Sequence, residues 1–193
     1  MHSILIFNII NMVINMDMIE KKLSGEIIYD GKIIKVEKHT VLCPNKNTST
    51  REVVRHKGGS TILYINENDE VLLIRQYRYA YNEVIYELPA GKLEALEDPY
   101  DSAIRELEEE AGLKASRLDY LGCIYPTCGY SDEVIHLYLA KDVIKTHTNF
   151  DSDEFIESYY IPLNDVKKMI ISGEIKDAKT ICAISRYLML NEK

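Results

Sequence analysis

Short stretches rich in β-branched residues alternate with polar turns between residues 19 and 56. Residues 26–42 hold two such stretches separated at Asp30-Gly31, a dipeptide typical of a β-hairpin. A polar turn over residues 44–50 precedes a third stretch over residues 51–56. The pattern predicts a small antiparallel sheet, too small to be stable alone. We therefore expect residues 18–57 to form an N-terminal β-sheet domain that packs on the rest of the chain or on a second subunit.

The remaining chain mixes strand and helix patterns. Residues 61–65 and 71–80 flank a polar turn and predict a strand pair, and residues 84–89 and 134–140 predict further strands. A helix is expected from Pro99 to Ala111, with Asp98 as N-cap and Gly112 after its end. Two more helices are expected over residues 163–172 and 180–190. Residues 58–193 should therefore form an α+β sandwich.

The first 17 residues have a different character. Residues 4–14 are mostly apolar but are interrupted by asparagines, and no basic region or small-residue cleavage site accompanies them. The apolar run is also too short to span a bilayer. We expect synthesis to start at Met16 or Met18, so that residues 1–17 are a non-native or disordered extension.

Composition narrows the class of protein. The chain has 193 residues, 46% of them hydrophobic and 28% charged, with 23 Lys and Arg against 31 Asp and Glu and a net charge of −8. An acidic chain without a basic run is a poor candidate for binding nucleic acid or an anionic membrane. The four cysteines form no CxxC pair, which favours reduced thiols in a cytoplasmic protein. A phosphorylated ligand would need a metal ion or a local arginine cluster.

The helix expected over residues 99–111 carries glutamates where local physics disfavours them. Glu106, Glu109 and Glu110 lie opposite the apolar stripe and in the C-terminal half of the helix. The like-charged i,i+4 pair and the helix dipole each cost about 0.3–1 kcal/mol. A divalent cation would reverse this repulsion, and oxygen ligands suit Mg²⁺ or Mn²⁺. On the helix alone, a solvated acidic surface is the competing interpretation.

Residues 91–113 follow the pattern G-x5-E-x7-R-E-U-x-E-E-x-G-U, where U is aliphatic. The pattern resembles the Nudix box of the Nudix hydrolases, which implies an α/β/α sandwich and a metal-dependent hydrolase. The resemblance makes Glu106 and Glu110 principal metal ligands, Glu109 a ligand or the catalytic base, and the carbonyl of Ala90 a further ligand. Arg105 can reach Glu109 one turn along the helix and Glu97 before it, and so can orient these carboxylates.

The likeness extends over residues 19–190 and is strongest to ADP-ribose pyrophosphatases, in segments such as RQYR, YELPAGKLE and GEIKDAKT. It implies that Arg78 contacts the substrate and that Glu87 lies near the metal site. A strand-surface charge is the alternative for Arg78, and a role in supporting the loop is the alternative for Glu87. It also implies a homodimer formed through the N-terminal sheet, with Arg51 and Glu52 near the adenine pocket, whereas an exposed strand pair is equally compatible with these two residues.

An acidic loop at residues 151–154 corresponds to one that closes over the substrate in that subfamily. The resemblance makes Glu154 the preferred metal ligand or general base there, with Asp153 next, while an ordinary acidic turn is the alternative. One departure lies at Cys128, where the subfamily usually has a proline; we expect this thiol to be buried and inert.

The implied activity is Mg²⁺-dependent cleavage of ADP-ribose to AMP and ribose 5-phosphate. Because of Cys128, another nucleoside diphosphate sugar or a dinucleotide stays open as the substrate. A ligand-sensing Nudix domain without catalysis is the alternative from another class of protein, and the complete set of glutamates argues against it.

Overall fold

The computed structural model describes residues 18–149 and 155–191. Of the two expected start sites, Met16 lies outside the described residues, as do Asp153 and Glu154. The chain forms two compact units, residues 1–55 and 56–193, and each is considered by itself.

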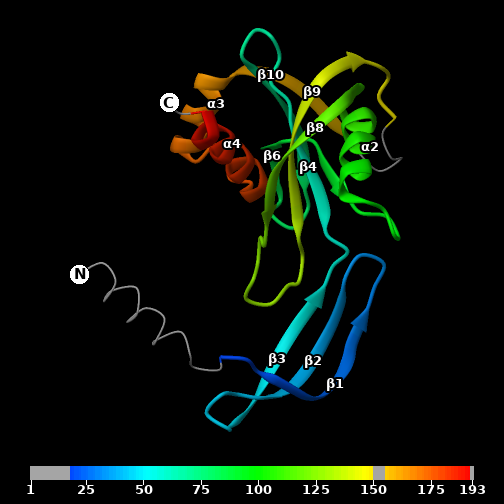
Figure 1. Cartoon of the computed structure of the whole chain (residues 1–193), viewed down its shortest axis with the longest axis vertical. Helices are drawn as coiled ribbons and strands as arrows, with labels where there is room; N and C mark the ends of the chain where they lie inside the picture. Colours follow the sequence, from blue (N-terminus) through cyan, green and yellow to red (C-terminus); the bar gives the residue numbers. More distant parts are fainter. Residues whose placement is uncertain (1–17, 150–154, 192–193) are drawn as a thin grey trace, which may run out of the picture. The chain divides into compact units, whose positions relative to one another are not determined.

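The first unit is a three-stranded antiparallel sheet in the order β1-β2-β3 (Figure 1). Its strands are β1 (Lys21–Asp30), β2 (Lys35–Leu42) and β3 (Thr48–Arg55). The predicted hairpin is present, but Asp30 pairs with Lys35, so residues 31–34 form the connection rather than a two-residue Asp-Gly turn. Among its described residues only His39 and Val41 are buried, so the sheet has almost no core of its own.

The second unit contains a mixed four-stranded sheet and a three-stranded antiparallel sheet. The four-stranded sheet has the order β7 (Ala90–Lys92), β4 (Gly59–Leu63), β9 (Ile135–Lys145) and β8 (Leu113–Ile124). Only β4 and β9 run parallel. The other sheet has the order β10 (Ile156–Pro162), β5 (Glu70–Arg78) and β6 (Glu83–Glu87).

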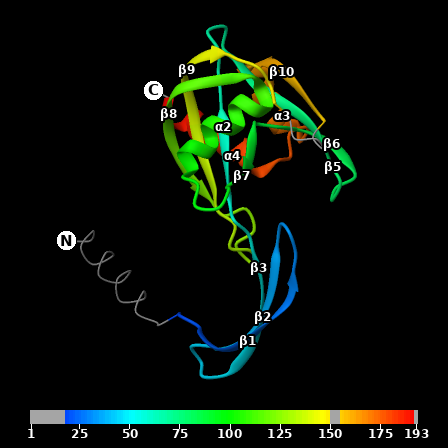
Figure 2. The same ribbon diagram turned by 90° about the vertical axis from the view of Figure 1, so that its right-hand side faces the viewer.

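Helices cover both faces of the four-stranded sheet (Figures 1 and 2). They are α2 (Pro99–Ala111) and α4 (Ala178–Asn191), whereas α3 (Leu163–Ser172) packs against β10 and β5 of the other sheet. Adjacent residues of β4 point to opposite layers: Ile62 packs with Leu107 of α2, and Leu63 packs with Ile184 of α4. This alternation confirms the predicted α/β/α sandwich. Within the described residues, no helix is long and apolar enough to cross a membrane.

The predicted strand pair over residues 61–65 and 71–80 is limited to the residues next to its polar turn. There an isolated bridge links Ile65 to Val71, and the Leu72 amide donates to the Tyr64 carbonyl at 3.0 Å. Beyond these contacts the strands part, because β4 pairs with β7 on one side and β9 on the other, whereas β5 pairs with β10 and β6. All five residues of β4 are buried, as expected for a strand central to a sandwich.

Candidate active site

Helix α2 begins and ends where the sequence predicts. The Asp98 side chain accepts a hydrogen bond from the Tyr100 amide at 2.8 Å, and Pro99 occupies the first turn. Gly112 adopts a left-handed conformation with φ 62° and donates its amide to the Glu108 carbonyl at 2.9 Å. The Ser60 hydroxyl donates to the Pro99 carbonyl at 2.7 Å and ties the start of the helix to β4. These contacts fix the helix that bears the glutamates.

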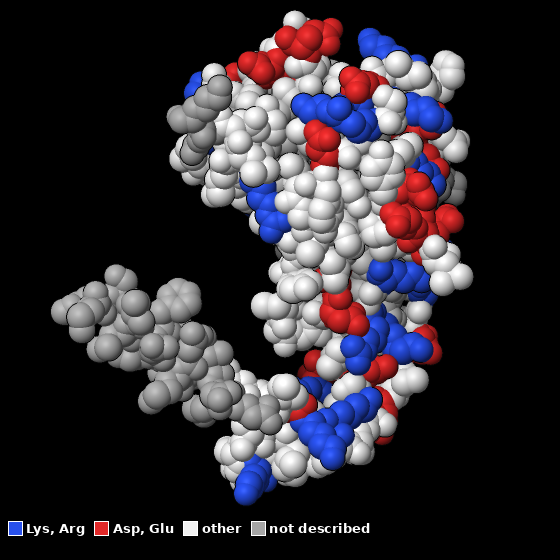
Figure 3. Space-filling view, viewed as in Figure 1, with Lys and Arg blue, Asp and Glu red and all other residues white. Residues whose placement is uncertain are grey.

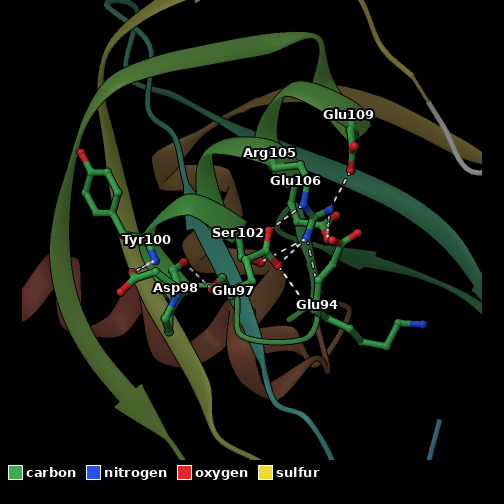
Figure 4. A network of polar contacts seen from close by, with 11 residues as sticks. Glu94, Glu97, Asp98, Tyr100, Ser102, Arg105, Glu106 and Glu109 are labelled. Carbon is green, nitrogen blue, oxygen red and sulfur yellow. Dashed lines mark hydrogen bonds and ion pairs between the residues drawn. The ribbon is translucent and has the colours of Figure 1, made fainter.

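Arg105 is the centre of a carboxylate network on this helix (Figure 4). Its Nε and Nη2 donate to the two oxygens of Glu97 at 2.8 and 3.0 Å. Its Nη1 donates to Glu106 at 2.7 Å and to Glu109 at 2.8 Å. The hydrogen bond from Arg105 lowers the pKa of Glu97, and the same bond raises the pKa of Arg105. The predicted contacts of Arg105 with Glu97 and Glu109 are both present, and the contact with Glu106 was not anticipated.

The glutamates do not form a solvated surface. The side chains of Glu106 and Glu109 are 13% and 35% exposed, and Glu110 is 3% exposed. Burying a carboxylate is costly unless it is paired or hydrogen-bonded. Glu110 accepts a hydrogen bond from the Ala90 amide at 2.9 Å, which brings the end of α2 against β7. The solvated-surface interpretation is therefore wrong for Glu106 and Glu110.

Gly91 makes room for Glu106. A Cβ atom at Gly91 would lie 1.8 Å from Oε1 of Glu106, so any side chain there would displace the carboxylate. The glycine of the Nudix pattern is thus explained by a close approach between β7 and α2, because only a residue without Cβ leaves this space.

The residues present fit a divalent cation with oxygen ligands. The candidate donors are the carboxylates of Glu106, Glu109 and Glu110 and the backbone carbonyl of Ala90, all of the hard type that Mg²⁺ prefers. Within residues 18–149 and 155–191, no three acidic, histidine or cysteine side chains converge on one point. Arg105 holds Glu106 and Glu109 at its own Nη1. Binding of a cation would therefore compete with Arg105 for these carboxylates.

Arg78 is held by a buried carboxylate. Its Nε and Nη2 donate to Glu87 at 2.5 and 2.8 Å, and the Glu87 side chain is 1% exposed. Burial alone would raise the pKa of Glu87, but Arg78 and Lys179 together outweigh burial and lower it. Sequence reasoning missed Lys179, which also donates to Glu87. Its only signal was its place in the GEIKDAKT segment.

The other predicted residues divide between the two units. Arg51 and Glu52 lie on β3 of the first unit, where Arg51 pairs with Glu20 and donates to Ser49 at 3.0 Å. Their proposed place near an adenine pocket stays a prediction, as do the roles of Asp153 and Glu154.

Two features beside the box were not predicted correctly from the sequence. Cys128 is exposed rather than buried, because it lies in a loop between β8 and β9. A hollow of about 410 Å³ lies beside Arg105 and Glu109, and its lining includes His147 and Asn149. The Asn149 amide donates to the Glu109 carbonyl at 2.9 Å. No sequence signal distinguished these two residues from ordinary loop residues.

The NUDIX domain family matches residues 55–183, and the chain belongs to this family. The chain is 38% identical over 175 residues to "ADP-ribose pyrophosphatase" of Bacillus subtilis (strain 168), which covers 90% of this chain and 94% of that protein. It is equally identical, with the same coverage, to "Methanol dehydrogenase activator" of Bacillus methanolicus. "ADP-ribose pyrophosphatase" of Mycobacterium tuberculosis (strain ATCC 25618 / H37Rv) is 32% identical over 84% of this chain and 80% of its own length.

A solved structure has the same fold. The structure titled "Crystal structure of ADP compounds hydrolase" superposes with a TM-score of 0.78 over 89% of this chain and 93% of that chain, at 20% sequence identity. The predicted family and fold are thereby confirmed.

Proposed function

We propose that this protein is a Mg²⁺-dependent pyrophosphohydrolase that cleaves ADP-ribose to AMP and ribose 5-phosphate. The proposal rests chiefly on one arrangement: Arg105 gathers Glu97, Glu106 and Glu109, while Glu110 is bonded to the backbone of Ala90. The names of two relatives, both called ADP-ribose pyrophosphatase, support the choice of substrate.

In the proposed reaction, water attacks one phosphorus and the bridging P–O bond of the diphosphate breaks. Glu109 accepts the proton of the water, with Glu154 as the alternative base. Glu109 suits this task because it is the most exposed of the Arg105-bound carboxylates, at 35% of its side chain. Mg²⁺, or Mn²⁺, held by Ala90, Glu106, Glu109, Glu110 and Glu154, would neutralise the diphosphate and lower the pKa of the water.

Arg78 is the proposed contact to the substrate diphosphate or ribose. Its side chain remains 39% exposed, and its Nη1 takes no part in the two-point bond to Glu87, which leaves a donor for an anion. On the face drawn in Figure 3, Lys and Arg side chains of the second unit lie among Asp and Glu side chains. We therefore propose that fixed arginines and a metal ion hold the anionic substrate, rather than a broad basic surface. Nucleic acid is not a proposed ligand.

We also propose a cytoplasmic homodimer formed through the first unit, with Arg51 and Glu52 contributing to the adenine pocket. The support is the exposure of large apolar side chains on a sheet that buries almost nothing itself. These exposed residues are Leu23, Ile27, Ile28, Tyr29, Ile33 and Ile34. A second copy of the chain would cover them.

The test is a substrate panel with Mg²⁺ in which product masses are measured, on protein starting at Met18. The panel contains ADP-ribose, NADH, FAD, ADP-glucose, UDP-glucose and a deoxynucleoside triphosphate. Preference for ADP-ribose with release of AMP and ribose 5-phosphate is the expected result. Preference for another diphosphate would contradict the substrate and direct attention to the exposed Cys128 turn, and binding without turnover would favour the sensing role.

The catalytic role of Glu109 is tested in the same assay. Glu109→Gln should lower kcat by at least about 100-fold, the usual contribution of a general base. Asp165→Asn is the control, because it neutralises a carboxylate of α3 that pairs with Lys168 at 2.7 Å on the surface and does not line the hollow beside Glu109. Near-normal turnover by Glu109→Gln would contradict its role as base or ligand.

A further inference from the structure

Lys179, in the first turn of α4, belongs to a line of alternating charges that leads to the candidate active site. Asp177 pairs with Lys179 at 3.1 Å, Lys179 donates to Glu87, and Glu87 accepts both donors of Arg78. Exposure of the side chains falls along this line from 16% for Asp177 and 10% for Lys179 to 1% for Glu87, and Arg78 is the more exposed cation at 39%. Arg78 is therefore the end of the network that can meet a ligand.

The geometry fixes the plane of the Arg78 guanidinium. A two-point bond through Nε and Nη2 leaves one edge of the group, with Nη1, pointing away from Glu87. Among the described residues, no side chain bonds that Nη1. The hydrogen bond to Glu87 is the main cause that raises the pKa of Arg78, and the charge of Glu110 adds to it. Arg78 therefore lies within electrostatic reach of the Nudix-box glutamates.

The charge of Lys179 changes what Glu87 does to Arg78. If Arg78 were the only cation beside Glu87, the buried carboxylate would cancel most of the field that Arg78 presents to an anion. Because Lys179 donates to the same Oε2 that accepts Arg78 Nη2, the negative charge of Glu87 is shared between two cations. Arg78 then keeps positive potential at its exposed edge, while its orientation stays fixed.

We propose that Lys179 is a positioning residue for substrate binding: through Glu87 it orients Arg78 and preserves the positive charge that Arg78 offers to the diphosphate. The inference rests on the proposed function, because it takes the ligand of Arg78 to be the substrate diphosphate. Lys179 itself, at 10% exposure and bonded to Glu87 and Asp177, does not touch the substrate.

The experiment compares wild type, Lys179→Met and Lys179→Arg. Lys179→Met should raise KM for ADP-ribose by about tenfold, the size of a weakened charge-assisted hydrogen bond, with a smaller change in kcat. Lys179→Arg keeps the cation and should restore KM to near the wild-type value. Calorimetric binding of ADP-ribose with metal chelated should weaken in parallel, which gives a readout independent of turnover.

An Arg78→Ala background separates positioning from packing. If Lys179 acts through Arg78, adding Lys179→Met to Arg78→Ala should change neither KM nor the metal-free Kd further. An equal loss in both backgrounds, or an unchanged KM in the single variant, would overturn the proposal. A merely structural lysine would lower Tm without moving KM.

Lys179→Met could also fail to fold, because it leaves a buried carboxylate with one cation fewer. The double variant Glu87→Gln/Lys179→Met removes both charges and avoids this. It should raise KM less than Lys179→Met does, since Arg78 keeps its field but loses its two-point bond to a carboxylate, and a wild-type KM would again overturn the proposal. Failure of the proposed function is distinguishable: wild type would then cleave another panel member, and the Lys179 series is measured on that substrate.

Discussion

Gly91 is a fixed position of the Nudix pattern, and the packing of the candidate site explains why it is glycine. A Cβ there would lie 1.8 Å from Glu106 Oε1, so Gly91→Ala must push this carboxylate away from its position beside β7. We expect Gly91→Ala to raise the Mg²⁺ concentration needed for half-maximal activity by about tenfold or more, as for disturbance of a ligand's supporting shell. A metal titration measures this, and circular dichroism controls for folding; an unchanged titration in folded protein would contradict the place of Glu106 in the metal site.

The pair of Glu97 with Arg105 makes a prediction about pH. The hydrogen bond from Arg105 lowers the pKa of Glu97 from 4.5, so the ionised form is stabilised in the folded state. Its contribution to stability is therefore present above pH 4.5 and is lost as the pH falls through the lowered folded pKa. Glu97→Gln should lower Tm by a few degrees at pH 7, and the difference from wild type should shrink toward zero in strong acid. A difference in Tm that is independent of pH would show that Glu97 acts by packing rather than by charge.

At this scale, sequence reasoning succeeded where partners are close along the chain. Arg105 finds Glu109 one helical turn away and Glu97 just before the helix, and both contacts follow from local geometry. Lys179 could not be found in this way, since it lies 92 positions from Glu87 and meets it only through the tertiary fold. The burial of Glu87 was likewise invisible, because a strand pattern does not say which polar residue a distant lysine will neutralise.

Among the elements, the start of α4 is tied to the loop that leads into β7. The Leu88 amide donates to the hydroxyl of Thr180 at 2.8 Å, and that hydroxyl donates to Asp177 at 2.6 Å. Thr180 is fully buried, so water cannot replace it. The helix thereby holds the backbone two residues before Ala90, whose carbonyl is a proposed metal ligand.

Thr180→Val keeps the shape of the side chain and removes the hydroxyl. It should lower the free energy of unfolding by about 1–3 kcal/mol, since a buried donor is left unsatisfied. It should also accelerate hydrogen exchange at the Leu88 amide and reduce kcat/KM. Thr180→Ser keeps the hydroxyl and is the matched control for exchange and activity. If both variants exchange Leu88 at the same rate, the hydroxyl does not hold the loop.

The ends of α2 and the β1–β2 hairpin followed from local signals, whereas β8 and β10 were not predicted and β4 and β5 were wrongly assigned to one strand pair. Asp98, Pro99 and Gly112 bracket α2 because capping and left-handed turns depend on a few adjacent residues. The polar turn over residues 66–70 suggested a hairpin, yet β4 and β5 belong to different sheets. The strands that pair with a buried strand can lie far along the chain, as β7 and β9 do for β4. The periodicity of one segment contains no information about such distant partners.

On the scale of the whole molecule, the unequal packing of the two units matters most. In the second unit, one buried cluster packs on each face of the four-stranded sheet. The described part of the first unit buries only His39 and Val41. A three-stranded sheet with so small a core needs a further partner surface to be stable. The exposed Ile27 and Ile28 of β1, at 56% and 58%, are candidates for that surface.

Ile27→Lys should therefore weaken self-association. Placing a charge in an apolar contact between two copies should raise the dimer dissociation constant by about tenfold or more, and light scattering over a range of protein concentrations measures it. Thr48→Lys introduces the same charge at an exposed polar position of β3 and is the matched control. If Arg51 and Glu52 contribute to the adenine pocket only in the dimer, KM for ADP-ribose should rise on dilution of Ile27→Lys but not of Thr48→Lys. A wild-type chain that stays monomeric at high concentration would contradict the dimer. If Ile27→Lys loses the dimer without any change in KM, the dimer does not contribute to substrate binding.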